Sequence, residues 1–333
     1  MLQLTMKIND KIYGEIEIEN EIILRLINTK PFQRLKEINQ YGAVNFVFEE
    51  GYQTTRYEHS IGVWYASYKL GGDLETQVAA LLHDVGHYAF SHLVDQAHED
   101  ASENAHELSL SKLPGWDEVE SILAEAGIAI KPVDEYLLIK NSLPDIGTDR
   151  LDYAVRDLES VFHAGDHFGK KVIENATLHN GQIAFKDVDV AKEFASRGNK
   201  AMWHVIYDPQ IAVIYQATID ILRAGLKDGW ITEADLLLTD AHVFNLMRQN
   251  RDKFESKYFR VFENQFNTVI ASDESDADFV HTKLKARYFD PKVLIEGEIK
   301  KVSELDAEFK SELNKFIQIF EDRKKGLPIK VIF

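Results

Sequence analysis

Apolar residues recur at helical spacing along most of this 333-residue chain, and glycine and proline separate the recurrences. A period of this kind predicts a mainly helical protein. Residues 188–229 predict two helices, or one helix with a break at Pro209. The other predicted helices cover residues 21–28, 31–41, 55–70, 74–86, 103–113, 116–126, 133–141, 149–163 and about 303–322.

Alternating polar and apolar residues predict strands in three other places. Residues 1–20 alternate on both sides of Tyr13-Gly14, which indicates a short strand pair. Residues 176–185 alternate around Asn180-Gly181, a dipeptide that favours a hairpin turn. Residues 256–300 contain short strand-like runs, which are Lys283–Phe289 and Lys292–Glu296. We therefore expect a mainly α fold with a short N-terminal β-hairpin and a small α+β C-terminal part.

An imidazole and a carboxylate stand side by side, as His83-Asp84, at the end of an apolar run. Two more histidines, His87 and His92, follow within nine residues. Nitrogen and hard oxygen donors together suit a catalytic divalent metal better than a closed structural zinc site. A helix end with surface histidines would give the same pair by chance, so the neighbouring patterns decide between the two interpretations.

Two other predicted helices carry further candidates. Thr55 and Glu58 have capping-box spacing, which places His59 in the first turn of its helix. In the helix at 149–163, one face carries three polar residues at i, i+4 and i+8, which are Asp149, Tyr153 and Asp157. A polar stripe is usually a solvated face, so its meaning depends on the rest of the set.

The order His59, then His83-Asp84, then Asp149 resembles the ligand pattern of the HD-domain metal-dependent phosphohydrolases. The surrounding words resemble the branch of dNTP triphosphohydrolases that includes bacterial dGTPases and the sterile-α-motif-and-HD-domain protein. These words are Ile8-Asn9-Asp10, Tyr13-Gly14, Phe32–Leu35, Thr55–Val63, Leu81–His92, His106-Glu107 and Asp149–Asp157. The resemblance is strong over residues 7–165 and continues weakly through Lys285–Pro291.

The resemblance implies a ligand set and a group of acid-base residues. One divalent ion (Mn, Mg, Fe, Ni or Zn) would be bound by His59, His83, Asp84 and Asp149. Phosphate contact or proton transfer would involve His87, His92, His106 and Glu107, and Asp95 would orient one of these histidines. His98-Glu99 competes with His106-Glu107 for this place. The residues that follow favour His106, but the choice stays open.

The resemblance also implies residues that hold the substrate. Arg56, Arg150 and Tyr153 would contact phosphates, because guanidinium and hydroxyl groups donate to phosphate oxygens. Asp157 would accept a hydrogen bond from a sugar hydroxyl, and Gln40 would lie near the sugar. The remaining histidines have no partner at ligand spacing, and we predict surface or satisfied core positions for them: His163, His167, His179, His204, His242 and His281.

Two words depart from the pattern of the family. Asn28 and Lys36 replace an acid and an arginine in a word that relatives use for activation by guanine nucleotides. We therefore expect no GTP activation of that type. Tyr207–Gln210 stands where relatives carry a Tyr-x-His-Lys word, which removes two basic groups. This loss indicates either a smaller substrate or phosphate-binding cations supplied from elsewhere in the chain.

The composition agrees with a soluble enzyme, which we expect to be cytoplasmic. The chain is 45% hydrophobic and 28% charged, enough to bury a full core. No apolar run reaches membrane-spanning length, the N-terminus lacks a signal-peptide pattern, and we expect no membrane partner. The absence of cysteine excludes disulfides and thiolate catalysis. A net charge of −17 argues against strong general nucleic-acid binding.

We predict a metal-dependent phosphohydrolase that cleaves dNTPs to deoxynucleoside and triphosphate, and that forms a homo-oligomer. The expected organisation is an HD-domain catalytic core at 1–165, a hairpin and helices that complete the core at 166–255, and a small α+β region at 256–333. An HD-type phosphatase or phosphodiesterase acting on nucleoside monophosphates or cyclic nucleotides is the first alternative. A non-catalytic nucleotide-binding regulator is the second alternative. Such a regulator is expected to have lost metal ligands, whereas this sequence keeps all four.

Overall fold

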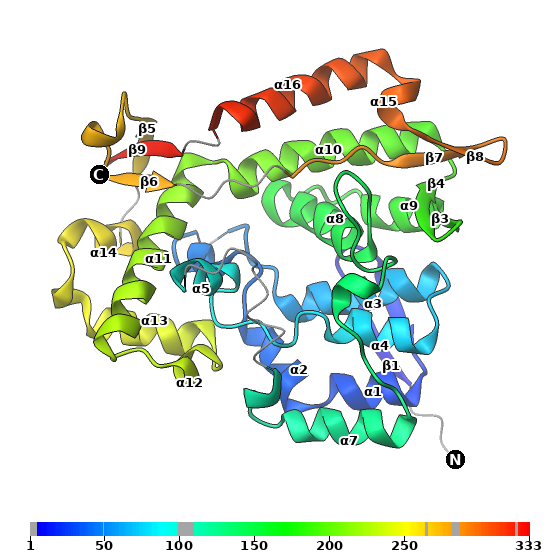
Figure 1. Cartoon of the computed structure of the whole chain (residues 1–333), viewed down its shortest axis with the longest axis horizontal. Helices are drawn as coiled ribbons and strands as arrows, with labels where there is room; N and C mark the ends of the chain where they lie inside the picture. The colour runs from blue at the N-terminus through cyan, green and yellow to red at the C-terminus, as the bar shows by residue number, and fades with distance from the viewer. Residues whose placement is uncertain (1–4, 49, 99–109, 264–265, 282–286, 324–325) are drawn as a thin grey trace.

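The computed structural model describes residues 5–48, 50–98, 110–263, 266–281, 287–323 and 326–333. This part of the chain is mainly helical and carries small sheets, as the sequence predicted (Figure 1). The N-terminal hairpin pairs β1 (Met6–Asp10) with β2 (Gly14–Ile18). Gly14 has a φ of +80°, a conformation that glycine adopts without steric cost. The predicted hairpin is therefore confirmed.

Helices from the first half of the chain pack on this hairpin and share one apolar core with it. They are α1 (Glu21–Ile27), α2 (Lys30–Arg34), α3 (Arg56–Lys69), α4 (Leu74–Leu82), α7 (Trp116–Ala126) and α8 (Thr148–Phe162). Short 3-10 helices η1 (Leu35–Glu37) and η2 (Gly42–Phe46) follow α2. The same core also takes in residues from α9 (Phe168–Asn175) and α10 (Val188–Ile206).

The region between residues 176 and 228 contains the second predicted hairpin and two long helices. Strands β3 (Ala176–His179) and β4 (Gln182–Phe185) meet at Asn180-Gly181, as expected. Helix α10 ends before α11 (Pro209–Asp228), which begins with its proline at the first helical position. Figure 1 shows α10 running alongside α8 and α11 descending at an angle to both. Of the two predicted alternatives for 188–229, the chain adopts two helices.

The C-terminal strands join two different sheets. Strand β7 (Lys292–Ile295) pairs in parallel with β4 and antiparallel with β8 (Glu298–Lys301), giving the order β3-β4-β7-β8. The second sheet has the order β5-β9-β6, from β5 (Asn267–Ile270), β9 (Leu327–Ile332) and β6 (Phe279–His281). The helices of this part are α12 (Glu233–Leu236), α13 (Asp240–Gln249), α14 (Ser256–Glu263), α15 (Val302–Leu305) and α16 (Ala307–Arg323).

Three predicted elements were wrong in extent or type. The predicted helix at 133–141 contains only a 3-10 turn, Val133–Glu135, because only Tyr136 and Ile139 of its side chains are buried. The helix at 74–86 ends at Leu82, and the residues that follow it form a loop in which Asp84 and Val85 are buried. The helix at 31–41 leaves helical geometry at Ile38. Helix α14 forms outside the two predicted strand-like runs, at residues for which no helix was predicted. Residues 103–109 and 282–286 lie outside the described part.

A second apolar core surrounds α11 and brings together η2, α5 (His92–Ala97), α13, α14 and the β5-β9-β6 sheet. The junction between the two cores, where α8, α10 and α11 approach α5, is where the site described below lies (Figure 1). Among the described residues, no helix combines the length and the apolar character needed to cross a membrane.

Candidate metal centre and active site

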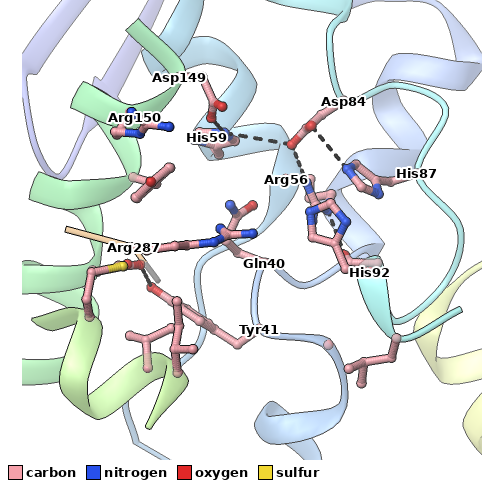
Figure 2. Close-up of a pocket in the computed structure, with 18 of the residues that line it drawn as sticks. Gln40, Tyr41, Arg56, His59, Asp84, His87, His92, Asp149, Arg150 and Arg287 are labelled. Carbon is pink, nitrogen blue, oxygen red and sulfur yellow. Dashed lines mark hydrogen bonds and ion pairs between the residues drawn. The ribbon is translucent and has the colours of Figure 1, made fainter. Parts of the chain in front are cut away.

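Three helices bring the four predicted ligands to one point, and Figure 2 shows three of them, His59, Asp84 and Asp149. His59 lies in the first turn of α3, behind a capping box in which Thr55 and Glu58 cap each other's backbone. His83 is the C-terminal cap of α4, and Asp84 follows it. Asp149 lies in the first turn of α8. The local capping signal therefore placed His59 correctly.

The donor atoms of these residues converge at short distances. His59 Nε2 lies 3.3 Å from His83 Nε2 and 3.1 Å from Asp149 Oδ1. These three residues each offer one ligand atom, and all three atoms lie within 4.8 Å of one another. Asp84 adjoins both imidazoles, with Oδ1 3.3 Å from His83 Nε2 and Oδ2 3.8 Å from His59 Nε2. The arrangement is compact enough for one ion.

The other ring nitrogens decide which atoms face this point. His59 Nδ1 lies 2.7 Å from Asp152 Oδ2, and His83 Nδ1 lies 2.8 Å from the Ala80 carbonyl oxygen. Both partners are acceptors, so each Nδ1 carries the proton and each Nε2 turns a lone pair toward the other. Two lone pairs and a carboxylate repel one another unless a cation lies between them. The donor set therefore fits a divalent metal ion.

Electrostatics lead to the same conclusion. Burial lowers the pKa of His59, but hydrogen bonds to Asp149 and Asp152 and the charge of Asp84 outweigh it and raise the pKa to about 10. The surrounding carboxylates thus favour a positive charge at this position. A metal ion supplies that charge without protonating the imidazole.

A buried ion network supports His59 from behind. Arg156 donates two hydrogen bonds of 2.8 Å to Asp152, and a third of 3.0 Å to Asp10 at the end of β1. Gly62 in α3 makes room for this network, because a Cβ built there would overlap the side chains of Asp152 and Arg156. The network fixes the tautomer and the direction of the His59 ring.

The loop after Asp84 is held in a strained shape. Phe90 and Ser91 have φ angles of +59° and +56°, in the region that L-residues rarely adopt. Asp240 at the start of α13 accepts the Phe90 N–H at 2.8 Å. Arg56 donates to Ser91 Oγ at 2.6 Å and also to Asp84. Arg34, from the family word Phe32–Leu35, donates hydrogen bonds to the backbone carbonyls of Val85 and His87 and so stabilises the loop.

Two further histidines lie on this loop beside the ligand set (Figure 2). His87 Nε2 is 3.2 Å from Asp84 Oδ1, and the His87 and His92 rings pack edge to face at 4.7 Å. His92 Nδ1 lies 3.1 Å from Asp95 Oδ2, as expected of an orienting carboxylate. His106 and Glu107 lie outside the described residues. His98 is exposed, 3.3 Å from Glu233, and does not line the cavity.

A cavity of about 440 Å³ opens from the ligand set. All three residues of the predicted α8 stripe line it, as do Gln40, Arg56 and Arg150. Asp157 Oδ1 accepts a 2.8 Å hydrogen bond from the Tyr41 hydroxyl, and burial raises the pKa of Asp157 to about 7. Gln40 Oε1 and Arg150 Nε are buried with no hydrogen-bond partner in the described chain, so the wall offers polar atoms to a ligand.

Several residues of this cavity were not predicted. Arg287 and Lys140 add positive charge, and Tyr215 adds a hydroxyl. Figure 2 places the Arg287 side chain between Arg150 and Tyr41. Arg287 lies in the weak C-terminal stretch of family resemblance, which was the available signal. The prediction for His281 was wrong: it is neither exposed nor satisfied, because it is buried against the cavity with Nδ1 unpaired among the described residues.

Residues in the two words that depart from the family pattern make contacts within the fold. Asn28 caps the end of α1 and donates a 2.7 Å hydrogen bond to the Leu24 carbonyl. The Lys36 ammonium lies 4.7 Å from the centre of the Tyr57 ring. Tyr207 is buried against Phe320 at the junction of α10 and α11, with ring centroids 4.2 Å apart. The prediction that GTP does not activate the protein remains a prediction.

Comparison with known proteins places the chain among relatives of one kind. The HD domain family matches residues 56–131. The uncharacterized protein YdhJ of Bacillus subtilis is 31% identical over 331 residues, covering 98% of this chain and 99% of that protein. The metal-dependent phosphohydrolase cns2 of Cordyceps militaris is 28% identical and covers 87% of this chain and 86% of that protein.

Two further matches, one partial and one more distant, also carry the name of a phosphohydrolase or triphosphohydrolase. The deoxynucleoside triphosphate triphosphohydrolase SAMHD1 of Gallus gallus is 31% identical over 203 residues, covering 45% of this chain and 33% of that protein. A phosphohydrolase structure from Bacteroides thetaiotaomicron matches with a TM-score of 0.65 at 17% identity, over 90% of this chain and 94% of that chain. At this identity the structural match shows a shared fold.

Proposed function

Because the chain belongs to the HD-domain metal-dependent phosphohydrolases, we propose that it hydrolyses deoxynucleoside triphosphates to deoxynucleoside and triphosphate. The observation that carries this proposal is the α8 wall of the cavity. One row of side chains on α8 runs along the cavity from the His–Asp cluster and consists of Asp149, Tyr153 and Asp157. It ends at the buried carboxyl group of Asp157, which accepts a hydrogen bond from the Tyr41 hydroxyl.

The ligand set would hold one divalent ion through His59, His83, Asp84 and Asp149. When bound, such an ion lowers the pKa of a water molecule and neutralises charge on a phosphate. The side chains behind the set keep it in place. Asp152 orients His59, the Ala80 carbonyl orients His83, and Arg56 holds one oxygen of Asp84.

Proton transfer falls to the histidines of the strained loop. Asp95 accepts from Nδ1 of His92, so the imidazolium form of His92 would deliver the proton on Nε2 to the leaving 5′ oxygen. His87 lies between His92 and Asp84, where it can contact the same phosphate. Arg150 donates from the α8 side of the cavity toward developing negative charge.

The spacing along α8 suits a phosphate followed by a sugar. With a rise of about 1.5 Å per residue, Tyr153 stands about 6 Å and Asp157 about 12 Å along the helix axis from Asp149. A phosphate at the ligand set therefore brings the deoxyribose between Tyr153 and Asp157. Asp157 and Tyr41 can bond its 3′-hydroxyl, and Gln40 lies on the same cavity.

Cations from outside the α10–α11 junction support a triphosphate tail. The junction word carries no basic residue, but Lys140, Arg150 and Arg287 come to the cavity from three other segments. Lys140 also pairs with Asp134 at 2.8 Å. A monophosphate would reach fewer of these cations than a triphosphate.

Hydrolysis of monophosphates or cyclic nucleotides is the second candidate, favoured by the absence of basic residues at Tyr207–Gln210. Product analysis separates the two. With Mn²⁺ and each dNTP in ¹⁸O-labelled water, we expect equal amounts of deoxynucleoside and triphosphate, with the label in triphosphate. Orthophosphate or pyrophosphate as the product, or activity confined to monophosphates, would overturn the proposal. Asp149→Ala is the matched inactive control.

A further inference from the structure

A second part of the cavity wall, which we call the second end, is made mainly of apolar side chains. Phe90, Leu93, Met202 and Val205 are buried there, and Tyr215 adds an aromatic ring from α11. These residues come from the loop before α5, from α5, and from α10 and α11, not from the helices of the ligand set. Apolar walls with a few placed polar groups are typical of sites for flat organic ring systems.

One polar residue of this end is a buried histidine. His281 is 3% exposed, lines the cavity, and has its Nδ1 buried with no hydrogen-bond partner in the part of the chain that the structure describes. It ends strand β6, where it pairs with Leu327 of β9. Phe279 and His281 are buried while Val280 between them is half-buried, so His281 points with Phe279 to the inner side of the strand.

An unpaired imidazole in this position needs an explanation, because an apolar side chain would fill the space without leaving a polar atom unsatisfied. Burial alone lowers the pKa of His281 to about 4, and no charged group contributes to the shift. The ring is therefore neutral near pH 7. A neutral imidazole offers one donor and one acceptor, which suits an uncharged polar edge better than a phosphate.

We propose that His281 is a specificity-determining residue that hydrogen-bonds the edge of the nucleobase, while the apolar walls around Phe90 and Tyr215 enclose its faces. This inference rests on the proposed function, because the base lies here only if the phosphates lie at the ligand set. The second end of the cavity would then hold the nucleobase. Discrimination among bases then arises from leaving a buried polar atom unpaired when the wrong edge is presented.

The test compares His281→Leu with the wild type and with Val280→Ala, a control on the same strand. We expect His281→Leu to lower kcat/KM for the preferred dNTP at least tenfold, mainly through KM, and to bring the four dNTPs within about threefold of one another. A base-free deoxyribose triphosphate should be hydrolysed equally by the three proteins. The melting temperature without ligand should not fall in His281→Leu, because no satisfied hydrogen bond is lost.

Three outcomes would overturn the inference. An unchanged order and spread of dNTP preferences in His281→Leu would show that His281 does not read the base. An equal loss on all four dNTPs and on the base-free compound would indicate a structural role. Failure of the wild type to hydrolyse or bind any dNTP, measured by calorimetry, would overturn the proposed function together with this inference. The first two outcomes leave the proposed function intact.

Discussion

The two ends of the cavity are built in different ways. The ligand end is charged and comes from α3, α4 and α8, all within the first half of the chain. The second end is mainly apolar and comes from η2, α5, α10, α11 and β6, which extends to residue 281. Most apolar residues of the second end belong to the core around α11, although Met202 belongs to the core that the helices of the ligand end share. The cavity therefore combines a charged wall with an apolar one.

This difference predicts different responses to substitution. At the ligand end, Arg156, Asp152 and Asp10 form a buried chain of charges, and removal of one partner of a buried pair costs about 3–5 kcal/mol. At the second end, side chains fill space and interact with a ring, so changes there alter affinity in steps of about 1–3 kcal/mol. Substitutions at the ligand end should abolish activity, while those at the second end should adjust it.

The largest effect is expected for Asp149→Ala. Asp149 offers an oxygen to the ligand set, and its side chain is 29% exposed; its partner His59 keeps a second carboxylate, Asp152, at 2.7 Å. We expect hydrolysis to fall at least about 10³-fold and bound metal to be lost, with little change in the melting temperature before metal is added. Metal analysis and thermal melting test this. Full metal content with normal turnover would contradict the assignment of the ligand set.

The next effect concerns the sugar, where the two ends meet. Asp157→Ala should lower kcat/KM for dNTPs by about 1.5–3 kcal/mol, the range for a hydrogen bond to a charged group. It should also narrow the gap between dNTPs and 2′,3′-dideoxynucleotides, because the 3′-hydroxyl loses its acceptor. Tyr41→Phe, which removes the hydroxyl that donates to Asp157 but keeps the carboxyl group, is the comparison variant. Equal losses on both substrates would make Asp157 a structural residue.

A third prediction tests how closely the ligand end is packed. Gly62→Ala places a Cβ against Asp152 and Arg156, so it should push Asp152 away from His59. We expect metal affinity to fall about 10–100-fold, as for other residues that orient a metal-binding histidine. Titration of the folded protein with metal measures the affinity. The comparison variant is Asp152→Asn, which removes the charge of the carboxylate and keeps the size of the side chain. Wild-type affinity in both variants would show that the network is not needed for binding.

The contrast between the ends also explains what sequence could predict. A capping box and a helix end place His59 and His83-Asp84 in their own segments, and the resemblance to the HD-domain pattern joined them with Asp149 into one set. The hairpin at Asn180-Gly181 and the break at Pro209 are likewise decided by a few neighbouring residues. The charged end of the cavity and the helical class of the fold were predictable for this reason.

The second end depends on contacts between distant segments, which a single sequence does not reveal. Nothing around His281 indicates that β6 places it at a cavity with residues of α10 and α11. The failure at 133–141 has a similar cause, because its apolar residues pack singly against a small cluster with α4 instead of forming a buried helix face. Arg287 had a weak family signal, but its position beside Arg150 required the fold (Figure 2).

The smallest effect is expected for Arg287→Gln, which tests whether the later part of the chain supplies the charge missing at Tyr207–Gln210. Arg287 lies at the cavity, and its charge acts on Tyr153 and Asp157 of α8. We expect KM for dNTPs to rise about tenfold, equal to about 1.4 kcal/mol, with kcat nearly unchanged, because a binding cation is lost and no reacting group. For nucleoside monophosphates, the change should be less than about threefold. Arg197→Gln, which removes an arginine paired with Asp166 outside the cavity, is the matched control. A similar rise for monophosphates and triphosphates would place Arg287 near the first phosphate, and no rise for either would leave the triphosphate tail to Arg150 and Lys140.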